Sequence, residues 1–263
     1  GGEEEQGLGI GLLKVMEDIM QAGGVGAFER VKQKCLLLLH AEDVSTRDEA
    51  LLGISSEFDQ MSSSEAQKLI EFAIFPILFF VRDMTKAEQE TGRVVISVAK
   101  ERGIELALQA MSSILGCAGV DGMDDNQTMD VLMIVTKTLT DFEDSSPPSD
   151  IPQVNCSETV VTSALGTIRR ILNMPDSVRI ELDDSCSPET FLPPRWLMKA
   201  WETSAAKLGY ALAVLLAVAR GSKVLSGAVS QQSLEILAFI FEYSGGCLER
   251  QGDYPSWISN AFS

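Results

Sequence analysis

The chain has 263 residues, 45% of them hydrophobic, and a formal net charge of −17 at pH 7. This length and hydrophobicity argue against global disorder and fit one large domain or two small ones. Because a strongly acidic chain is repelled by phosphate backbones and by anionic lipid, we expect no direct binding to nucleic acid or to a membrane surface.

The first half of the chain is predicted to be helical throughout, because apolar residues recur there at helical spacing. The first helix covers residues 7–22 and ends at Gly23 and Gly24. Its apolar stripe consists of Leu8, Leu12, Leu13, Met16, Ile19 and Met20. Further helices are expected at residues 27–40, 47–59, 64–81, 85–102 and 104–115, with an interruption at Pro76 and a break at Gly103.

Two helix starts in this half have recognisable capping residues. Ser45 or Thr46 is expected to cap the helix that begins at residue 47. Ser64, followed by Gln67 three residues later, has the pattern of a capping box.

The segment from Asp43 to Ile54 resembles the second helix of a HEAT repeat over about a dozen residues. In that family an Asp in the turn precedes an Arg on the helix and then a small residue that faces the partner helix. Asp43, Arg47 and Ala50 match these positions, whereas Thr46 departs from the usual apolar residue before the Arg. The resemblance implies a helical-repeat fold.

The second half begins with a helix at residues 126–139, followed by an acidic, Ser- and Pro-rich loop at 141–156. Next come a helix at 157–173 and an acidic, irregular stretch at 176–194. Within that stretch, residues 177–182 alternate with a period of two, which is typical of a short strand or an extended edge. A central helix between Pro193 and Gly221, a helix from residue 224 or 230 to 243, and short segments at 247–251 and 255–262 complete the chain.

The central helix is the most apolar part of the chain. Tyr210 to Ala219 contains no charged residue, so this half must be covered on nearly every side. The run without charged or strongly polar side chains, Leu208 to Ala219, is shorter than the roughly 20 residues that a membrane span needs. The sequence therefore predicts a buried helix and no membrane span.

About ten helices joined mainly by short turns predict an all-α fold. We interpret them as an irregular α-solenoid of HEAT or armadillo type, with an irregular helical bundle as the alternative. The acidic loop at 141–156 is a point at which two helical halves could divide. We favour a single helical-repeat domain over residues 6–263, because the apolar content is similar on both sides.

The sequence offers few groups for catalysis. His40 is the only histidine, so a multi-histidine metal site is excluded, and its position at a helix end suits a capping or surface residue. The five cysteines include no Cys-x-x-Cys pair, which predicts neither a zinc site nor a disulfide framework and favours a reducing compartment. No phosphate-binding glycine motif is present. We therefore predict no catalytic residue, metal or cofactor.

Basic residues gather around the central helix, in contrast to the acidic chain. The predicted partner-binding residues are Arg195, Trp196, Lys199, Lys207, Arg220 and Lys223. Trp201 follows the apolar face and is expected in the core, whereas Trp196 is the better candidate for exposure. Because Trp and Arg are enriched in binding hot spots, we expect this helix to line a groove for an acidic or amphipathic peptide. Ordinary solubilising charges on a core helix are the alternative.

These observations predict a non-catalytic scaffold or adaptor that binds partner proteins, as a subunit or regulatory module of a larger complex in the cytoplasm or nucleus. The alternative is an all-helical enzyme with an unrecognised site.

Overall fold

The computed structural model describes residues 25–89, 98–140, 153–154, 156–174, 195–221 and 225–251. In these residues the secondary structure is helical apart from one isolated antiparallel bridge between Thr140 and Val154. The predicted all-α class is therefore confirmed. The predicted helix at 7–22, the candidate strand at 177–182 and the short segment at 255–262 lie outside the described residues, as does most of the acidic loop at 141–156.

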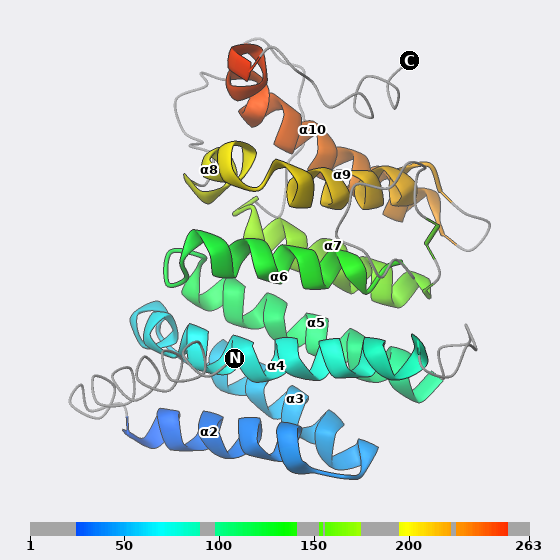
Figure 1. Ribbon diagram of the computed structural model, residues 1–263. Helices are drawn as coiled ribbons and strands as arrows, with labels where there is room; N and C mark the ends of the chain where they lie inside the picture. Colours follow the sequence, from blue (N-terminus) through cyan, green and yellow to red (C-terminus); the bar gives the residue numbers. More distant parts are fainter. Residues whose placement is uncertain are drawn as a thin grey trace. The chain divides into compact units, whose positions relative to one another are not determined.

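The described helices follow one another along the chain as labelled in Figure 1. They are α2 (Val25–His40), α3 (Val44–Asp59), α4 (Ser63–Gln89), α5 (Val98–Ala118), α6 (Asp125–Lys137), α7 (Glu158–Ile171), α8 (Arg195–Thr203), α9 (Ala205–Ala219) and α10 (Gly227–Gln251).

The chain divides into two compact units, Gly1–Met123 and Asp124–Ser263. The division falls directly before α6 and not in the acidic loop at 141–156. The single domain predicted over residues 6–263 stays a prediction.

In the first unit, α2 packs on α3, and α4 packs on α5. In addition α2 contacts α4, and α3 contacts α5, so each helix buries its apolar stripe against at least two neighbours. The fully buried side chains include Phe28, Leu38, Leu51, Ile54, Phe58, Leu69, Ile70, Ile77, Leu108, Met111 and Ile114.

Acidic side chains take part in both helix starts, in place of the hydroxyl cap expected at α3 and of the glutamine expected in the capping box of α4. Asp43 caps α3, because its Oδ1 accepts a hydrogen bond from the Thr46 backbone N–H at 2.8 Å. The capping box of α4 lies two residues before the predicted one. There the Ser62 N–H and hydroxyl both donate to Glu65 Oε2, at 3.2 and 2.7 Å. A carboxylate satisfies the free N–H groups and interacts favourably with the positive end of the helix dipole.

Three expected interruptions do not end a helix. Pro76 lies inside α4, and α5 runs through Gly103. Gly103 is buried, and a Cβ atom added to it would lie 3.3 Å from Cζ of Phe80 on α4. A missing side chain at this position therefore permits the close approach of α4 and α5. Likewise α10 continues past residue 243 and through the glycine pair at 245–246 to Gln251.

In the second unit, α6 packs on α7, α8 and α9, and α10 packs on the same three helices. The apolar helix α9 is buried on nearly every side, as predicted from its lack of charge. Two hydrogen bonds anchor it in this core. Tyr210 Oη lies 2.6 Å from Thr140 Oγ1, and the Ser233 hydroxyl donates to the Leu215 carbonyl at 2.7 Å.

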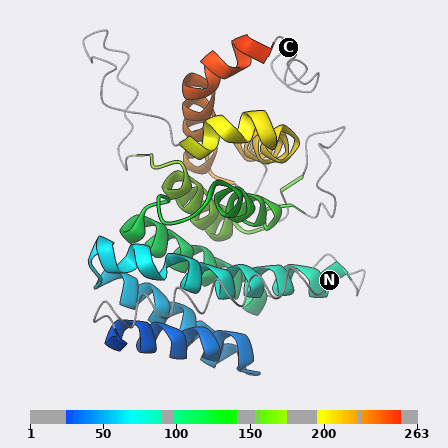
Figure 2. The ribbon, with the colours of Figure 1, turned by 60° about the vertical axis from the view of Figure 1, so that its left-hand side comes forward.

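The single central helix predicted between Pro193 and Gly221 is wrong, because α8 and α9 meet at an angle of 111°. The change of direction is visible in Figure 1 and Figure 2. Ser204 occupies the break with a non-helical backbone (φ −139°, ψ 33°). Ser and Thr compete with the helix for backbone hydrogen bonds, and the Thr203 hydroxyl donates to the Lys199 carbonyl at 3.0 Å. The bend allows α8 to pack on α6, α9 and α10 at once.

Among the described helices none is by itself long and apolar enough to cross a membrane, while the bent pair α8–α9 meets that criterion of length and composition when its two parts are taken together.

Two glycines make a matched test of packing. A Cβ at Gly122 would lie 2.8 Å from Ile70 Cγ2 and 3.1 Å from the Gln67 carbonyl oxygen, whereas a Cβ at Gly166 in α7 meets nothing within 4 Å. We expect Gly122→Ala to lower the free energy of unfolding by about 1–3 kcal/mol through overpacking. Gly166→Ala should raise it by about 1 kcal/mol through helix propensity. Chemical denaturation of both variants measures the difference, and equal effects would contradict the packing described.

The buried thiol of Cys35 predicts a pH dependence. Burial raises the pKa of this thiol from 9.0 to about 12. The pKa of this thiol is higher in the folded chain than in the unfolded chain. The free energy of unfolding is therefore undiminished by Cys35 below pH 9 and falls as the pH rises toward 12. Above pH 9 we expect Cys35 to lower the free energy of unfolding by up to about 1.4 kcal/mol per pH unit. Urea unfolding of wild type and Cys35→Ala between pH 8 and 10.5 measures this component, and parallel pH profiles would refute it.

Candidate functional site

The most unusual surface in the described residues is an accumulation of exposed apolar side chains on the first unit. Seven of the eight large apolar side chains that are exposed belong to α2, α3 or α4, and only Leu234 lies elsewhere. Single exposed apolar residues are normal, but a group of them marks an interaction site. This surface is therefore the first candidate site.

Four of these side chains gather along the contact between α2 and α4. The rings of Phe28 on α2 and Phe72 on α4 lie 5.2 Å apart between centroids, which fixes the sides on which the two helices meet. Phe79 follows Phe72 by seven residues, about two helical turns, and therefore lies on the same side of α4. Leu39 follows Phe28 by eleven residues, about three turns, and lies on the same side of α2.

Leu36 and Phe75 lie next to this contact on the outer side of their helices. In Figure 1, α2 and α4 run in the same direction. Because Phe28 and Phe72 lie at the same level, Phe75 and Phe79 come level with α2 residues near 31 and 35. We call the set Leu36, Leu39, Phe75 and Phe79 the apolar face. The exposed fractions are 46% and 38% for the two leucines and 56% and 58% for the two phenylalanines.

Polar groups surround the apolar face at one-turn spacing. Lys32 and His40 lie four residues before and after Leu36, and Glu71 lies four residues before Phe75. The Lys32 ammonium lies 5.8 Å from the Phe28 ring centroid and 3.3 Å from Glu29. An apolar centre with a polar rim is the usual composition of a protein–protein contact.

Sequence reasoning missed the apolar face, although it assigned the helices. The buried side of α4 is defined by Ala66, Leu69, Ile70, Ala73 and Ile77. Phe75 and Phe79 depart from this i, i+3, i+4 stripe, and that departure is the signal that could have identified them.

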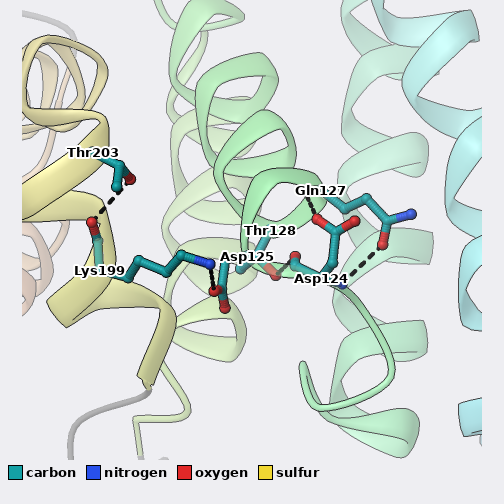
Figure 3. A network of polar contacts seen from close by, with 6 residues as sticks. All are labelled: Asp124, Asp125, Gln127, Thr128, Lys199 and Thr203. Atoms are coloured by element: carbon teal, nitrogen blue, oxygen red, sulfur yellow. Dashed lines mark hydrogen bonds and ion pairs between the residues drawn. The ribbon is translucent and has the colours of Figure 1, made fainter. Parts of the chain in front are cut away.

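The predicted cationic site has a different environment from the one expected. Lys199 Nζ donates to Asp125 Oδ2 at 2.8 Å, and Lys207 Nζ donates to Asp130 Oδ1 at 3.1 Å. The hydrogen bond and charge of Asp125 raise the pKa of Lys199 above its ordinary value. Both lysines are exposed, but acidic residues of α6 already face them. Figure 3 shows the pair of Lys199 and Asp125.

The first turn of α6 positions these acids. Asp124 caps the helix, because its Oδ1 accepts from the Gln127 N–H at 2.8 Å while the Gln127 side chain accepts from the Asp124 N–H at 2.9 Å. This capping box orients Asp125 toward α8 (Figure 3). Asp124 thus stabilises the start of α6, and Asp125 pairs with Lys199 of α8.

The expected exposure of Trp196 is wrong. Its side chain is 4% exposed, and the indole N–H donates to the Ile171 carbonyl at 3.2 Å, which ties α8 to the last turn of α7. Trp201 is buried, as predicted. The bend at Ser204 is the reason, since it places α8 against α6 and α10 as well as α9. Arg195 and Arg220 are exposed, and Lys223 lies outside the described residues. A role of these six residues in partner binding stays a prediction.

Groups for metal chemistry are sparse in the described part of the chain, where no three His, Cys, Asp or Glu side chains are placed to hold an ion. His40 is exposed at the last turn of α2, in the position expected from the sequence.

The buried environment of Trp196 can be tested directly. Trp196→Phe keeps most of the apolar contact but leaves the Ile171 carbonyl without its donor, so we expect a loss of about 1–2 kcal/mol in the free energy of unfolding. Trp196→Ala should cost about 3–5 kcal/mol because it also leaves a cavity. Denaturant unfolding measures both, and loss of less than 0.5 kcal/mol in the Ala variant, within the range of about ±0.5 kcal/mol typical of surface changes, would mean that the ring is not part of the core.

Comparisons with protein-family models, with curated proteins and with solved structures found no match to this chain.

Proposed function

We propose that this protein is a non-catalytic scaffold or adaptor that binds an amphipathic helix of a partner protein on the apolar face of α2 and α4. The observation that carries the proposal is the exposure of Phe75 and Phe79 beside Leu36 and Leu39. We further propose that the protein works inside the cell, as a subunit or regulatory module of a larger complex.

Helix packing within each unit supports an α-solenoid of HEAT or armadillo type. In the first unit, the hairpins α2–α3 and α4–α5 stack so that α2 meets α4 and α3 meets α5. In the second, α6 pairs with α7 and α9 with α10, while α6 meets α9 and α7 meets α10. Stacked hairpins of this kind are the building principle of helical repeats.

The residues that resemble a HEAT repeat have contacts in keeping with that proposal. Asp43 caps α3, and Arg47 Nε donates to the Ala41 carbonyl at 2.7 Å, so both side chains hold the turn between α2 and α3. Ala50 is buried in the helix contact with 3% of its surface exposed. A small residue there permits close approach of the paired helices.

The chemistry of the apolar face suits an amphipathic helix. Aromatic side chains supply large contact areas with few rotatable bonds, and a neighbouring helix can insert apolar residues between two ridges. In helix-in-groove recognition, the bound helix inserts apolar anchors at positions i, i+3, i+4 and i+7. Over about two turns, such anchors can contact Leu36, Leu39, Phe75 and Phe79.

The cationic residues of α8 and α9 are proposed as a secondary contact. Lys199 and Lys207 face Asp125 and Asp130, so an acidic peptide would have to displace these carboxylates. Exposed ion pairs contribute little to stability and are screened by salt. Replacing these carboxylates by those of a peptide therefore costs little free energy. Arg195 and Arg220 are exposed at the far ends of α8 and α9 and could extend such a contact.

Substitution of the two phenylalanines tests the proposed function. We expect Phe75→Asp with Phe79→Asp to weaken the binding of the partner by about thirty-fold or more, because hot-spot truncations cost about 2 kcal/mol or more. Partners are captured from cell extract on the wild-type chain, and the purified pair is then titrated by calorimetry. Leu52→Asp on α3, which is 50% exposed and lies outside the apolar face, is the control and should leave the affinity unchanged.

Circular dichroism verifies that both variants remain folded. The proposal fails if every captured protein binds the Phe75/Phe79 variant as tightly as it binds wild type. If the cationic residues form a secondary contact, Lys199→Glu with Lys207→Glu should weaken partner binding, and the loss of affinity should be smaller at high salt.

A further inference from the structure

We propose that, in the absence of a bound partner helix, a second copy of this chain covers the apolar face through an antiparallel contact between the α4 helices of the two copies. The inference rests on the proposed function, because the second copy and the partner helix compete for the same surface. It is carried by the order of charged and aromatic residues along the exposed side of α4.

The exposed side of α4 has two phenylalanines at its centre and opposite charges at its two ends. Glu71, Phe75, Phe79 and Arg82 follow one another at intervals of four, four and three residues, so they form one stripe along the helix. All four side chains are exposed. Because the acid lies toward the start of α4 and the base toward its end, the stripe is complementary to a reversed copy of itself.

One register aligns all of these residues. If a two-fold axis crosses α4 at the level of Ile77, positions equally far before and after Ile77 lie opposite each other in the two copies. Phe75 of one copy then faces Phe79 of the other. Glu71 comes within about one residue, or about 1.5 Å along the helix, of the position opposite Arg82. Because the contact is symmetric, each of these pairs forms twice.

The charges favour the antiparallel arrangement over a parallel one. In a parallel contact, Glu71 would face Glu71 of the second copy and Arg82 would face Arg82, and like charges opposite each other are unfavourable. In the antiparallel contact each charge faces its opposite. The paired phenylalanine rings add to the attraction beyond the area that they bury.

The leucines of α2 extend this contact at its side. Since Phe28 and Phe72 lie at the same level, Leu36 and Leu39 come level with α4 residues near 80 and 83. They lie beside the aromatic pairs and enlarge the apolar area that a second copy removes from water.

The local charge of this surface permits two copies to approach. Two chains with a net charge of −17 repel each other, so a contact between copies needs a surface without an excess of acids. The helix α2 has three basic residues and one acid, and α4 up to residue 84 has two basic residues and three acids. These two helices are therefore close to neutral, in contrast to the chain as a whole.

Occupation by a second copy regulates access to the apolar face. A partner helix binds only those copies whose face is open, so its apparent affinity falls with the fraction of open copies. Because dimers form by mass action, this fraction falls as the concentration of the chain rises. The partner must therefore compete with self-association.

Sedimentation equilibrium of the full chain without a partner tests the contact. We expect wild type to form a concentration-dependent dimer, and Phe75→Asp with Phe79→Asp to raise the Kd of the dimer by about thirty-fold or more. Leu52→Asp on α3 is the control and should leave this Kd unchanged. Wild type that stays monomeric up to about 1 mM would overturn the inference.

Charge reversal tests the antiparallel register. Glu71→Arg places bases at both ends of the stripe and Arg82→Glu places acids at both ends, so each variant should dimerise about tenfold more weakly than wild type. Glu71→Arg combined with Arg82→Glu in one chain restores opposite charges and should dimerise like wild type. A mixture of the two single variants should form mixed dimers in preference to either symmetric dimer, which native mass spectrometry measures.

A matched variant controls for net charge. Glu49→Arg on α3, at an exposed position outside the apolar face, changes the charge by the same amount as Glu71→Arg and should leave the dimer unchanged. The inference is overturned if the two variants have equal effects on the dimer, or if the mixture shows no preference for mixed dimers.

Titration of a captured partner tests the competition. Its apparent affinity should fall as the chain concentration rises above the Kd of the dimer. An apparent affinity that is independent of chain concentration would mean that the dimer and the partner use different surfaces, and the competition would be wrong.

The two proposals fail separately. If no dimer forms but the partner still needs Phe75 and Phe79, the partner site stands and the self-association is wrong. If the dimer forms in the expected register but no captured protein discriminates the Phe75/Phe79 variant, the face serves self-association alone and the scaffold function is wrong.

Discussion

Burial of apolar helix faces against two neighbours is the constraint on which this structure depends. No sheet supports the described helices, so each must find its own partners for an apolar stripe. The first unit satisfies this requirement through paired contacts among α2, α3, α4 and α5. The second does so around α9, which has apolar residues on all sides and is therefore enclosed. Gly103 permits the close contact of α4 and α5, since a side chain at this position would push the two helices apart.

The same constraint explains why the apolar face is conspicuous. A helix needs a stripe of about 100° to join the core, and α4 exceeds it, because Phe75 and Phe79 lie outside the buried side. In water this surplus is unfavourable and does not contribute to the fold of the unit. This exposure is the observation on which the proposed contact with a partner protein rests.

Electrostatics have a supporting part. The net charge of −17 makes the electrostatic potential around the chain predominantly negative. Locally, however, acids and bases pair across helices, as Asp125 does with Lys199 and Glu57 with Arg30 at 2.8 Å each. Where such pairs are exposed, as between Lys199 and Asp125, they contribute little to stability. Two lysines of the basic cluster predicted from the sequence, Lys199 and Lys207, are therefore already paired with acids of α6.

The sequence by itself determined the helical class, the approximate position of most helices and the burial of the second half of the central helix, because these follow from local periodicity and from the absence of charge. It did not determine the bend at Ser204, the buried position of Trp196 or the uninterrupted course of α5 through Gly103. Those features depend on which helix packs beside which. Tertiary structure alone also decided that Phe75 and Phe79 are exposed, since only the neighbours of α4 define which of its apolar sides is covered.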